Sequence, residues 1–399
     1  MKHIPGLAFL LVFLAALAAV LLRWEIPGTG PGSYTPRVTP VSSLGYVLVG
    51  DNVHRPGKTN ALVLFDSSSW AVVRRIRLPD SRAQSFARDP LGRIWVGLSG
   101  DFDRADNRVL VFSPGGDLIR TVKVCDIPQA GTAFAGGRAF VACMERGFGG
   151  TVSVIDLANL QVVDRITVKG APGRPFLLTA IAAADEAVVV AAATEPPLGA
   201  TVTGDAPFAQ VVFLDRVTGK EINRIVLTEP AGIWQIIPFG RQFLLLNNDW
   251  HAYKAPAGSM VPRPQAEVHA GNLMLVSARA GLTEKLAIPD LPFRGAVWGD
   301  HIYVLHRAWS APVDVRDRFV SVDALPNGTA ERLYTLSPGF ESRDMAVYKG
   351  RIYLTRGDYQ SDDEDGLWVI DTEGHPRLVL PVPDASQVIM PAEAGPPGD

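Results

Sequence analysis

The chain has 399 residues, of which 47% are hydrophobic and 20% are charged, and its formal net charge is -3. This composition is ordinary for a globular protein with a large core and excludes an intrinsically disordered chain. No basic stretch stands out, so nucleic acid is excluded as the main partner.

The first segment of interest is the hydrophobic run at residues 4–22, IPGLAFLLVFLAALAAVLL. It is uncharged and about long enough to cross the hydrocarbon layer as a helix. Lys2 precedes it, and positive charge is retained on the cytoplasmic side, so the rest of the chain should emerge outside. The run continues to Leu22 without a cleavage site of small residues, which favours an uncleaved anchor. Cleavage and secretion remain the alternative, and both interpretations export the domain.

The anchor is followed by a short segment that cannot bury itself. Residues 26–39 are rich in Pro, Gly, Ser and Thr, which is typical of a stalk. We therefore predict a membrane anchor or uncleaved signal at 1–25 and a stalk at 26–39.

The rest of the chain repeats one unit. A hydrophobic strand with an acidic or small polar last residue occurs seven times, ending at Asp66, Ser113, Asp156, Asp215, Ser277, Asp323 and Asp371. A strand opened by a tight turn precedes each occurrence, and a turn and a further strand follow it. Four short strands in units of about 45 residues are typical of a β-propeller, whereas a β-sandwich would rarely keep one unit over seven repeats.

We therefore predict an all-β fold, a seven-bladed β-propeller of four-stranded antiparallel blades over residues 40–382, preceded by one N-terminal transmembrane helix. Residues 383–399 are mostly Pro, Gly, Ala and acidic residues, so we expect a flexible C-terminal tail. No strand exchange is evident from the sequence, and the ring would close by packing or by a short terminal strand.

The third unit, TVSVIDLANLQVVDRITVKGAPGRP from Thr151 to Pro175, resembles the YVTN-repeat propellers in its order of strand, Asp, turn, strand, Gly and Pro. The similarity to NHL and gluconolactonase-like propellers is looser. The resemblance covers residues 40–382 in outline, and the other units lack the Gly-Pro step. It implies a fold, whereas the function is open, because such propellers serve as binding platforms, lyases, lactonases and assembly factors.

Cys125 and Cys143 are the two cysteines of the chain. They lack the spacing of a zinc site and would fall near the end of one blade and on the second strand of the next. In an exported domain they could form one disulfide, and otherwise they are two small buried hydrophobic residues.

One face of the predicted propeller carries the longest connections. The connection between the second and third strands leaves a blade at the same end as the blade-to-blade connection, and it is longest at 194–209 and 247–270. Aromatic residues with Arg suit recognition, although any one of them could be a solvated loop residue. The candidates for ligand or partner binding on this face are Trp250, His251, Tyr253, Arg307, Trp309, Arg356 and Tyr359.

Arginines beside the first strands of four blades form a second candidate set. These are Arg82, Arg174, Arg294 and Arg343, and the channel mouth should lie where they do. They could hold an anionic ligand, or they could pair in a structural ring with Asp101, Asp249, Asp344 and Asp358.

A catalytic site would need a metal ion bound by carboxylate and amide oxygens, as in a lactonase or lyase. The candidate ligands are Glu145, Asn247, Asn248 and Asp249, and the ion would be calcium. The segment from Asp101 to Asp106 lacks the central Gly and closing Glu of a calcium loop. We predict no cofactor and keep the calcium site as an alternative.

The resulting hypothesis is a monomeric, membrane-tethered propeller outside the cytoplasm, in the periplasm or on the cell surface. It would be a non-catalytic platform for a protein, an envelope polymer or a small anionic ligand. A metal-dependent lactonase- or lyase-like hydrolase with its site at the channel mouth is the alternative. The catalytic residues of such an enzyme are unknown.

Overall fold

The computed structural model describes residues 43–50, 59–100, 104–144, 149–170, 176–194, 209–227, 232–248, 271–288, 292–299, 301–306, 321–324, 331–336, 342–357 and 364–392. The predicted anchor and stalk lie outside these ranges. Within these ranges, the structure has no helix long and apolar enough to cross a membrane.

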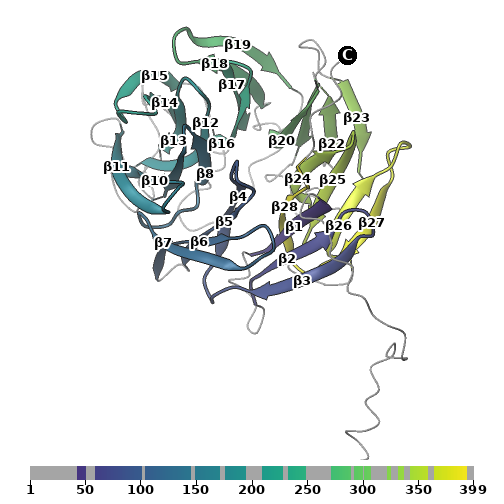
Figure 1. Cartoon of the computed structure of the whole chain (residues 1–399). Helices are drawn as coiled ribbons and strands as arrows, with labels where there is room; N and C mark the ends of the chain where they lie inside the picture. The colour runs from purple at the N-terminus through teal and green to yellow at the C-terminus, as the bar shows by residue number, and fades with distance from the viewer. Residues whose placement is uncertain are drawn as a thin grey trace, which may run out of the picture. The chain divides into compact units, whose positions relative to one another are not determined.

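The described residues form strands that pair into seven antiparallel sheets of four strands each, one sheet for each repeat unit (Figure 1). The four-stranded blade predicted from the repeat is confirmed. From inner to outer edge, the sheets are β28(Ala385–Ile389), β1(Leu44–Val49), β2(Ala61–Asp66), β3(Ala71–Arg77); β4(Ala83–Arg88), β5(Ile94–Gly100), β6(Ala105–Phe112), β7(Leu118–Lys123); β8(Gly131–Ala135), β9(Arg138–Cys143), β10(Gly149–Asp156), β11(Gln161–Lys169); β12(Phe176–Ala183), β13(Val188–Thr194), β14(Ala209–Leu214), β15(Glu221–Leu227); β16(Gly232–Phe239), β17(Gln242–Asn248), β18(Asn272–Ser277), β19(Gly281–Ala287); β20(Pro292–Trp298), β21(His301–His306), β22(Ser321–Ala324), β23(Glu331–Thr335); and β24(Ser342–Tyr348), β25(Arg351–Arg356), β26(Gly366–Ile370), β27(Pro376–Pro381).

The inner strands neighbour one another in the order β4, β8, β12, β16, β20, β24 and β28, and β28 returns to β4 (Figure 1). The sheets therefore surround a common axis, and the domain is a β-propeller. Apolar side chains fill the space between neighbouring blades. The strands next to the inner strand are buried along most of their length, as in β1, whereas outer strands such as β3 are largely exposed.

The ring is closed by the C-terminal strand. β28 pairs antiparallel with β1, with Val388 opposite Val47, so the first blade contains both ends of the domain. Ala385 and Val388 are buried in the same apolar cluster as Val47. The predicted domain end at 382 and the flexible tail over 383–399 are therefore wrong for residues 385–389. The short terminal strand closes the ring, while residues 393–399 lie outside the described residues.

The recurring acidic residue at the end of the third strand has a structural explanation. The Oδ1 of Asp215 accepts hydrogen bonds from the backbone N–H groups of Val217, at 3.0 Å, and Thr218, at 2.7 Å. Asp66, Asp156 and Asp371 make equivalent contacts. Such an Asp fixes the turn into the fourth strand, because its carboxylate replaces a backbone acceptor. These hydrogen bonds lower the pKa of Asp215.

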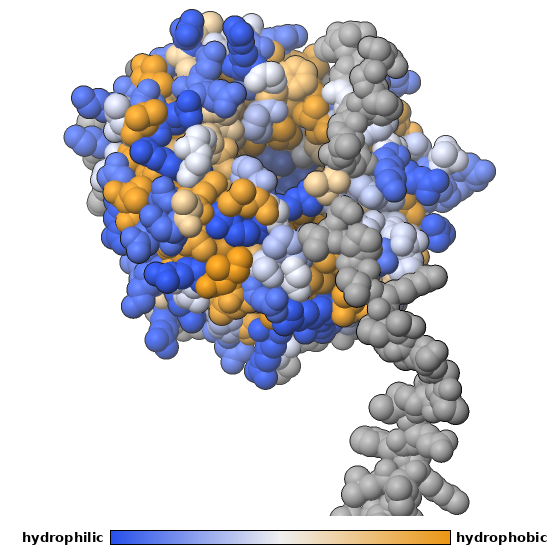
Figure 2. All heavy atoms as spheres, viewed as in Figure 1, coloured by the Kyte–Doolittle hydropathy of each residue, from blue (hydrophilic) through white to orange (hydrophobic). Residues whose placement is uncertain are grey.

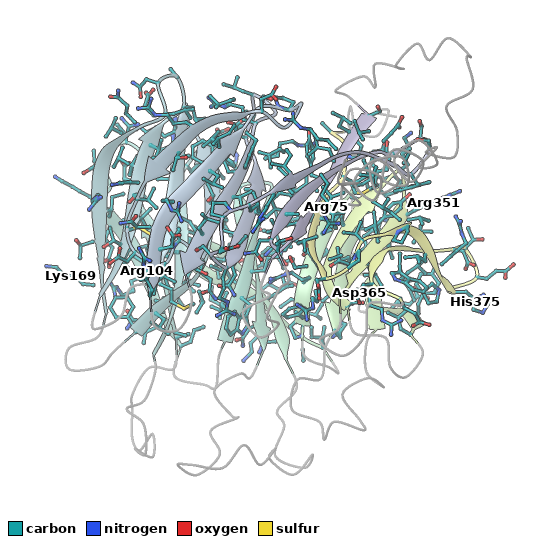
Figure 3. The ribbon with its side chains drawn as sticks, turned by 90° about the horizontal axis from the view of Figure 1, so that it is seen from below. Arg75, Arg104, Lys169, Arg351, Asp365 and His375 are labelled. Atoms are coloured by element: carbon teal, nitrogen blue, oxygen red, sulfur yellow. A yellow bond between two sulfur atoms is a disulfide. The ribbon has the colours of Figure 1, made fainter. Side chains whose placement is uncertain are left out.

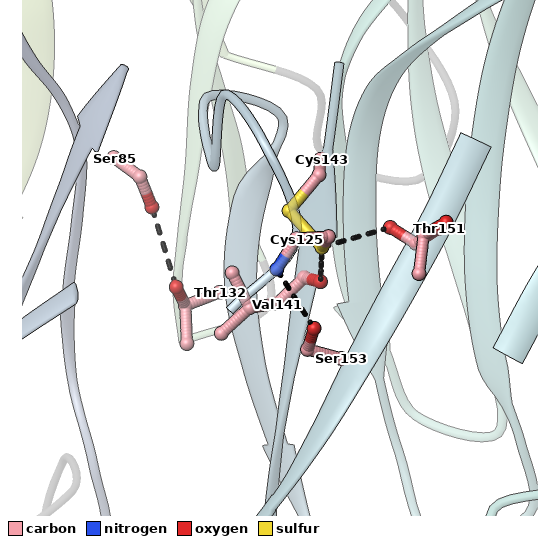
Figure 4. Close-up of a disulfide and its surroundings, with 7 residues drawn as sticks. All are labelled: Ser85, Cys125, Thr132, Val141, Cys143, Thr151 and Ser153. Carbon is pink, nitrogen blue, oxygen red and sulfur yellow. Dashed lines mark hydrogen bonds between the residues drawn. A yellow bond between two sulfur atoms is a disulfide. The ribbon is translucent and has the colours of Figure 1, made fainter. Parts of the chain in front are cut away.

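The two cysteines form a disulfide, with their Cα atoms 5.8 Å apart (Figure 4). It joins the connection after β7 to the end of β9, the positions predicted from the sequence. The Cys125 N–H donates to the Ser153 hydroxyl at 3.1 Å, and the cysteines are 3% and 0% exposed. The bond therefore ties the second and third blades together inside the protein.

Candidate functional site

The inner strands share an irregularity near the end from which the long connections leave. The pairing register shifts at Ala83/Ser85, Leu178/Ala180, Ile233/Gln235, Pro292/Arg294 and Ser342/Asp344, and β28 skips Ser386 against β1. Each shift is a β-bulge, which turns one side chain away from the regular alternation. The bulged positions are Gln84, Thr179, Trp234, Phe293, Arg343 and Ser386.

The position after the bulge connects neighbouring blades. We call the residues Ser85, Gln235, Arg294, Asp344 and Gln387 the belt. Gln235 donates from Nε2 to the carbonyl of Gly295 at 3.0 Å, and its Oε1 accepts the Gly295 N–H at 2.7 Å. Gln387 donates to the carbonyl of Gln84 at 2.6 Å, and the hydroxyls of Ser85 and Thr132 lie 3.3 Å apart.

The belt also contains an ion pair. The Nε of Arg294 lies 3.4 Å from Oδ1 of Asp344, and Oδ2 of Asp344 accepts the N–H of Val388 at 2.9 Å. The two side chains are 24% and 16% exposed. Burial raises the pKa of Asp344, and the guanidinium opposes that shift. Burial lowers the pKa of Arg294, and Asp344 opposes that shift. The belt thus braces each junction from β16 through β28 to β8.

The bulged side chains fall into two groups. The small or polar ones bond within their own blade: Thr179 donates to the carbonyl of Ala191 at 3.5 Å, Ser386 donates to that of Leu48 at 2.8 Å, and Gln84 accepts from the Ser99 hydroxyl at 2.9 Å.

The large ones lie on three consecutive inner strands, and we call Trp234, Phe293 and Arg343 the mouth residues. All three are half-buried. The guanidinium carbon of Arg294 lies 4.6 Å from the centre of the Phe293 ring. Figure 2 shows that the domain is hollowed at the centre of the ring.

The four predicted arginines do not occupy equivalent positions. Arg294 belongs to the belt and pairs with Asp344, one of the carboxylates expected for a structural ring. Arg343 is a bulged residue. Arg82 precedes β4, and its carbonyl accepts the Ser99 N–H at 2.8 Å. Arg174 lies outside the described residues.

Among the loop candidates, Arg356 is described at the end of β25. It forms an ion pair with Glu364, and its guanidinium carbon lies 6.0 Å from the ring centre of Trp368. Trp250, His251, Tyr253, Arg307, Trp309 and Tyr359 lie outside the described residues, and their predicted role stays a prediction.

Among the metal-ligand candidates, Asn247 is 3% exposed, and its Oδ1 accepts the Gly232 N–H at 2.9 Å. Its amide oxygen thus holds the start of β16. The backbone of Asn248 ends β17, whereas Glu145 and Asp249 lie outside the described ranges.

Within the part of the chain that the structure describes, one group of side chains comes close enough to hold an ion. It comprises Asp371, Glu373 and His375, whose ligand atoms lie within 4.8 Å of one another. All three are exposed in the turn before β27, with His375 at the outer edge of the domain (Figure 3). Asp371 already accepts the N–H groups of the other two residues. The group therefore serves the turn and lies away from the bulged ends of the inner strands.

Sequence reasoning missed Trp234, Phe293, Gln235 and Gln387 as residues of the channel. An alignment of the repeats on the start of each first strand would have placed them at two adjacent positions. A one-residue bulge has no composition of its own, so the sequence alone did not show which positions these were.

Comparison with known proteins supports the class of protein and no family. No known family profile matches the chain, and no curated protein matches it. The similarity to the YVTN-repeat family is therefore unconfirmed.

Several solved structures resemble the domain. Hydrazine synthase of Kuenenia stuttgartiensis has a TM-score of 0.56 and 16% identity, covering 79% of this chain and 90% of that one. The dihydro-heme d1 dehydrogenase NirN in complex with DHE has a TM-score of 0.52 and 11% identity, covering 91% and 66%. The β-propeller domain of Cps50 (Swd1) from Myceliophteria thermophila has a TM-score of 0.51 and 13% identity, covering 75% and 88%. At these identities the likeness shows the propeller fold alone.

Proposed function

We propose that the protein is a non-catalytic binding platform, held outside the cytoplasm by residues 4–22, that presents the long-connection face of a rigid propeller. The observation that carries this proposal is the use made of the polar groups in the ring. Gln235, Arg294, Asp344 and Gln387 brace neighbouring blades, and Asn247 holds a backbone N–H.

Connection length supports the position of the binding face. β13 ends at Thr194 and β14 begins at Ala209, while β17 ends at Asn248 and β18 begins at Asn272. At the other end of the blades, turns such as that from Phe239 to Gln242 are short. Long connections on a rigid scaffold are the usual carriers of binding specificity.

The disulfide supports export. Disulfides persist in oxidising compartments and are rare where thiols are kept reduced. Together with the apolar run at 4–22, the bond between Cys125 and Cys143 favours a location on the outer side of the membrane.

The test compares the purified full-length chain in detergent with a variant whose residues 249–270 are replaced by a short Gly-Ser turn. We expect the wild type, and not the variant, to sediment with purified cell-wall polymer while both melt at similar temperatures. Equal sedimentation of the two proteins, or sedimentation of neither, would contradict a platform built on this loop.

A metal measurement tests the enzyme alternative. The platform predicts no stoichiometric divalent ion after dialysis and no change in melting temperature on addition of a chelator. One tightly held ion per chain, with destabilisation by the chelator, would favour the metal-dependent hydrolase.

A further inference from the structure

We propose that the mouth residues Trp234, Phe293 and Arg343 form the recognition wall of a site for a carboxylated saccharide. This inference rests on the proposed function, because it names the ligand class of the same face. It places recognition on the inner strands in addition to the loops.

The first argument is the bulge itself. A bulge re-aims a side chain, and a bulge recurs at one level in the blades that contain Trp234, Phe293 and Arg343. Because the inner strands β16, β20 and β24 are consecutive neighbours, the three side chains belong to one side of the channel mouth.

The second argument is that large bulged side chains and long connections occur together. The blades of Trp234 and Phe293 also carry the connections 249–271 and 307–320. In the blades of Thr179, Ser386 and Gln84, the bulged side chain is folded back onto its own sheet. The mouth is therefore lined asymmetrically, with aromatic rings and a guanidinium on one side and small or polar groups on the other.

The third argument is preorganisation. Trp234 is followed by Gln235, whose amide makes a paired contact with the backbone of Gly295. Phe293 is supported by the guanidinium of Arg294, and Arg343 precedes Asp344 in the ion pair. Side chains fixed in this way lose little freedom on binding, which favours affinity.

The chemistry of the wall selects the ligand class. Aromatic faces pack against the flat, apolar side of a ring, as in other small-molecule sites. A guanidinium presents a planar fork that matches a carboxylate. Hydroxyl and amide groups at Thr179, Ser386 and Gln84 suit a ligand rich in hydroxyls. An acidic sugar combines these three features in one molecule.

The test measures binding of trigalacturonate to the full-length chain by calorimetry, with its methyl ester as a neutral counterpart of the same shape. We expect the acid to bind about tenfold or more tightly than the ester. Arg343→Met should remove this difference, and Trp234→Leu or Phe293→Leu should weaken both ligands. Arg351→Met, an exposed arginine in the same blade, is the matched control and should change neither.

The outcomes separate this inference from the platform. Equal binding of acid and ester, no binding of either, or unchanged binding by Arg343→Met would overturn the proposed wall. Displacement of the sugar by equimolar inorganic phosphate would also overturn it, because the site would then recognise an anion alone. If Arg343→Met and wild type sediment equally with the cell-wall polymer while the loop variant does not, the platform stands and the wall fails.

Discussion

The ion pair of the belt allows a sharp test of what holds the ring together. Arg294→Met removes the guanidinium that opposes the effect of burial on the pKa of Asp344, so this pKa should rise further. A carboxyl group whose folded pKa is raised stabilises the protein below its unfolded pKa, and this contribution is lost as pH rises through the folded pKa. The stability lost through Arg294→Met should therefore increase with pH, starting near the ordinary carboxyl value of 3.8.

The magnitude follows from the environment of the pair. Removing one partner of a fully buried pair costs roughly 3–5 kcal/mol. The side chains of Arg294 and Asp344 are 24% and 16% exposed, so solvent screens part of the interaction. We expect a loss of about 2–3 kcal/mol near pH 8 and roughly 1 kcal/mol near pH 4, the latter from the contact with Phe293.

Urea unfolding of the full-length chain at a series of pH values measures the effect, with an unchanged slope as the sign of a pure change in stability. The matched background is Asp344→Asn, in which Arg294→Met should cost about 1 kcal/mol at every pH. The reasoning is refuted if the loss is the same at all pH values, or if the two substitutions are additive.

Three further predictions concern ring closure, the disulfide and the turns. Removing residues 384–399 deletes β28 and should abolish the cooperative melting transition, whereas removing 393–399 alone should leave the melting temperature unchanged. Replacing Cys125 and Cys143 together by Ala should lower the free energy of unfolding by about 3 kcal/mol, while reductant should hardly affect the native protein, because both sulfurs are buried. For Asp215→Asn, the lowered pKa of Asp215 means that the wild-type advantage exists above the ordinary carboxyl pKa and disappears as pH falls through the folded value. Melting curves from about pH 2 to 6 check this, and a difference that does not change with pH would contradict it.

The sequence revealed the blades because their turns need particular residues. Asp66, Asp156, Asp215 and Asp371 accept the N–H groups of the turns that follow them, so the same chemistry recurs once per unit. Between these positions, the strands are apolar because they are buried between neighbouring blades. Period and strand type could therefore be predicted together.

The closing strand was missed for a physical reason. In β28, Ser386 is bulged and Gln387 belongs to the belt, so two adjacent polar residues replace the expected apolar alternation. Ala385 and Val388 carry the packing on either side of them. A strand of this kind resembles a polar tail until its partner β1 is known.

The candidate site was predicted less well than the fold, because sequence reasoning looked for function in the loops. Arg294 and Arg343 were selected correctly as residues near the channel, but the sequence could not show that they occupy different positions around a bulge. Only the register shows that one braces the ring while the other belongs to the mouth residues.

The belt differs in strength around the ring, and the difference has a structural basis at Gly295. A Cβ at this position would lie 3.0 Å from Ile237 Cδ1 and 3.3 Å from the carbonyl oxygen of Tyr303, tighter than ordinary contacts, so glycine allows the backbone to meet both amide groups of Gln235. The next junction holds the ion pair of Arg294 and Asp344, whereas the junction between β4 and β8 has a single contact between hydroxyls. The strongest bracing thus lies beside the mouth residues, where a binding wall must move least.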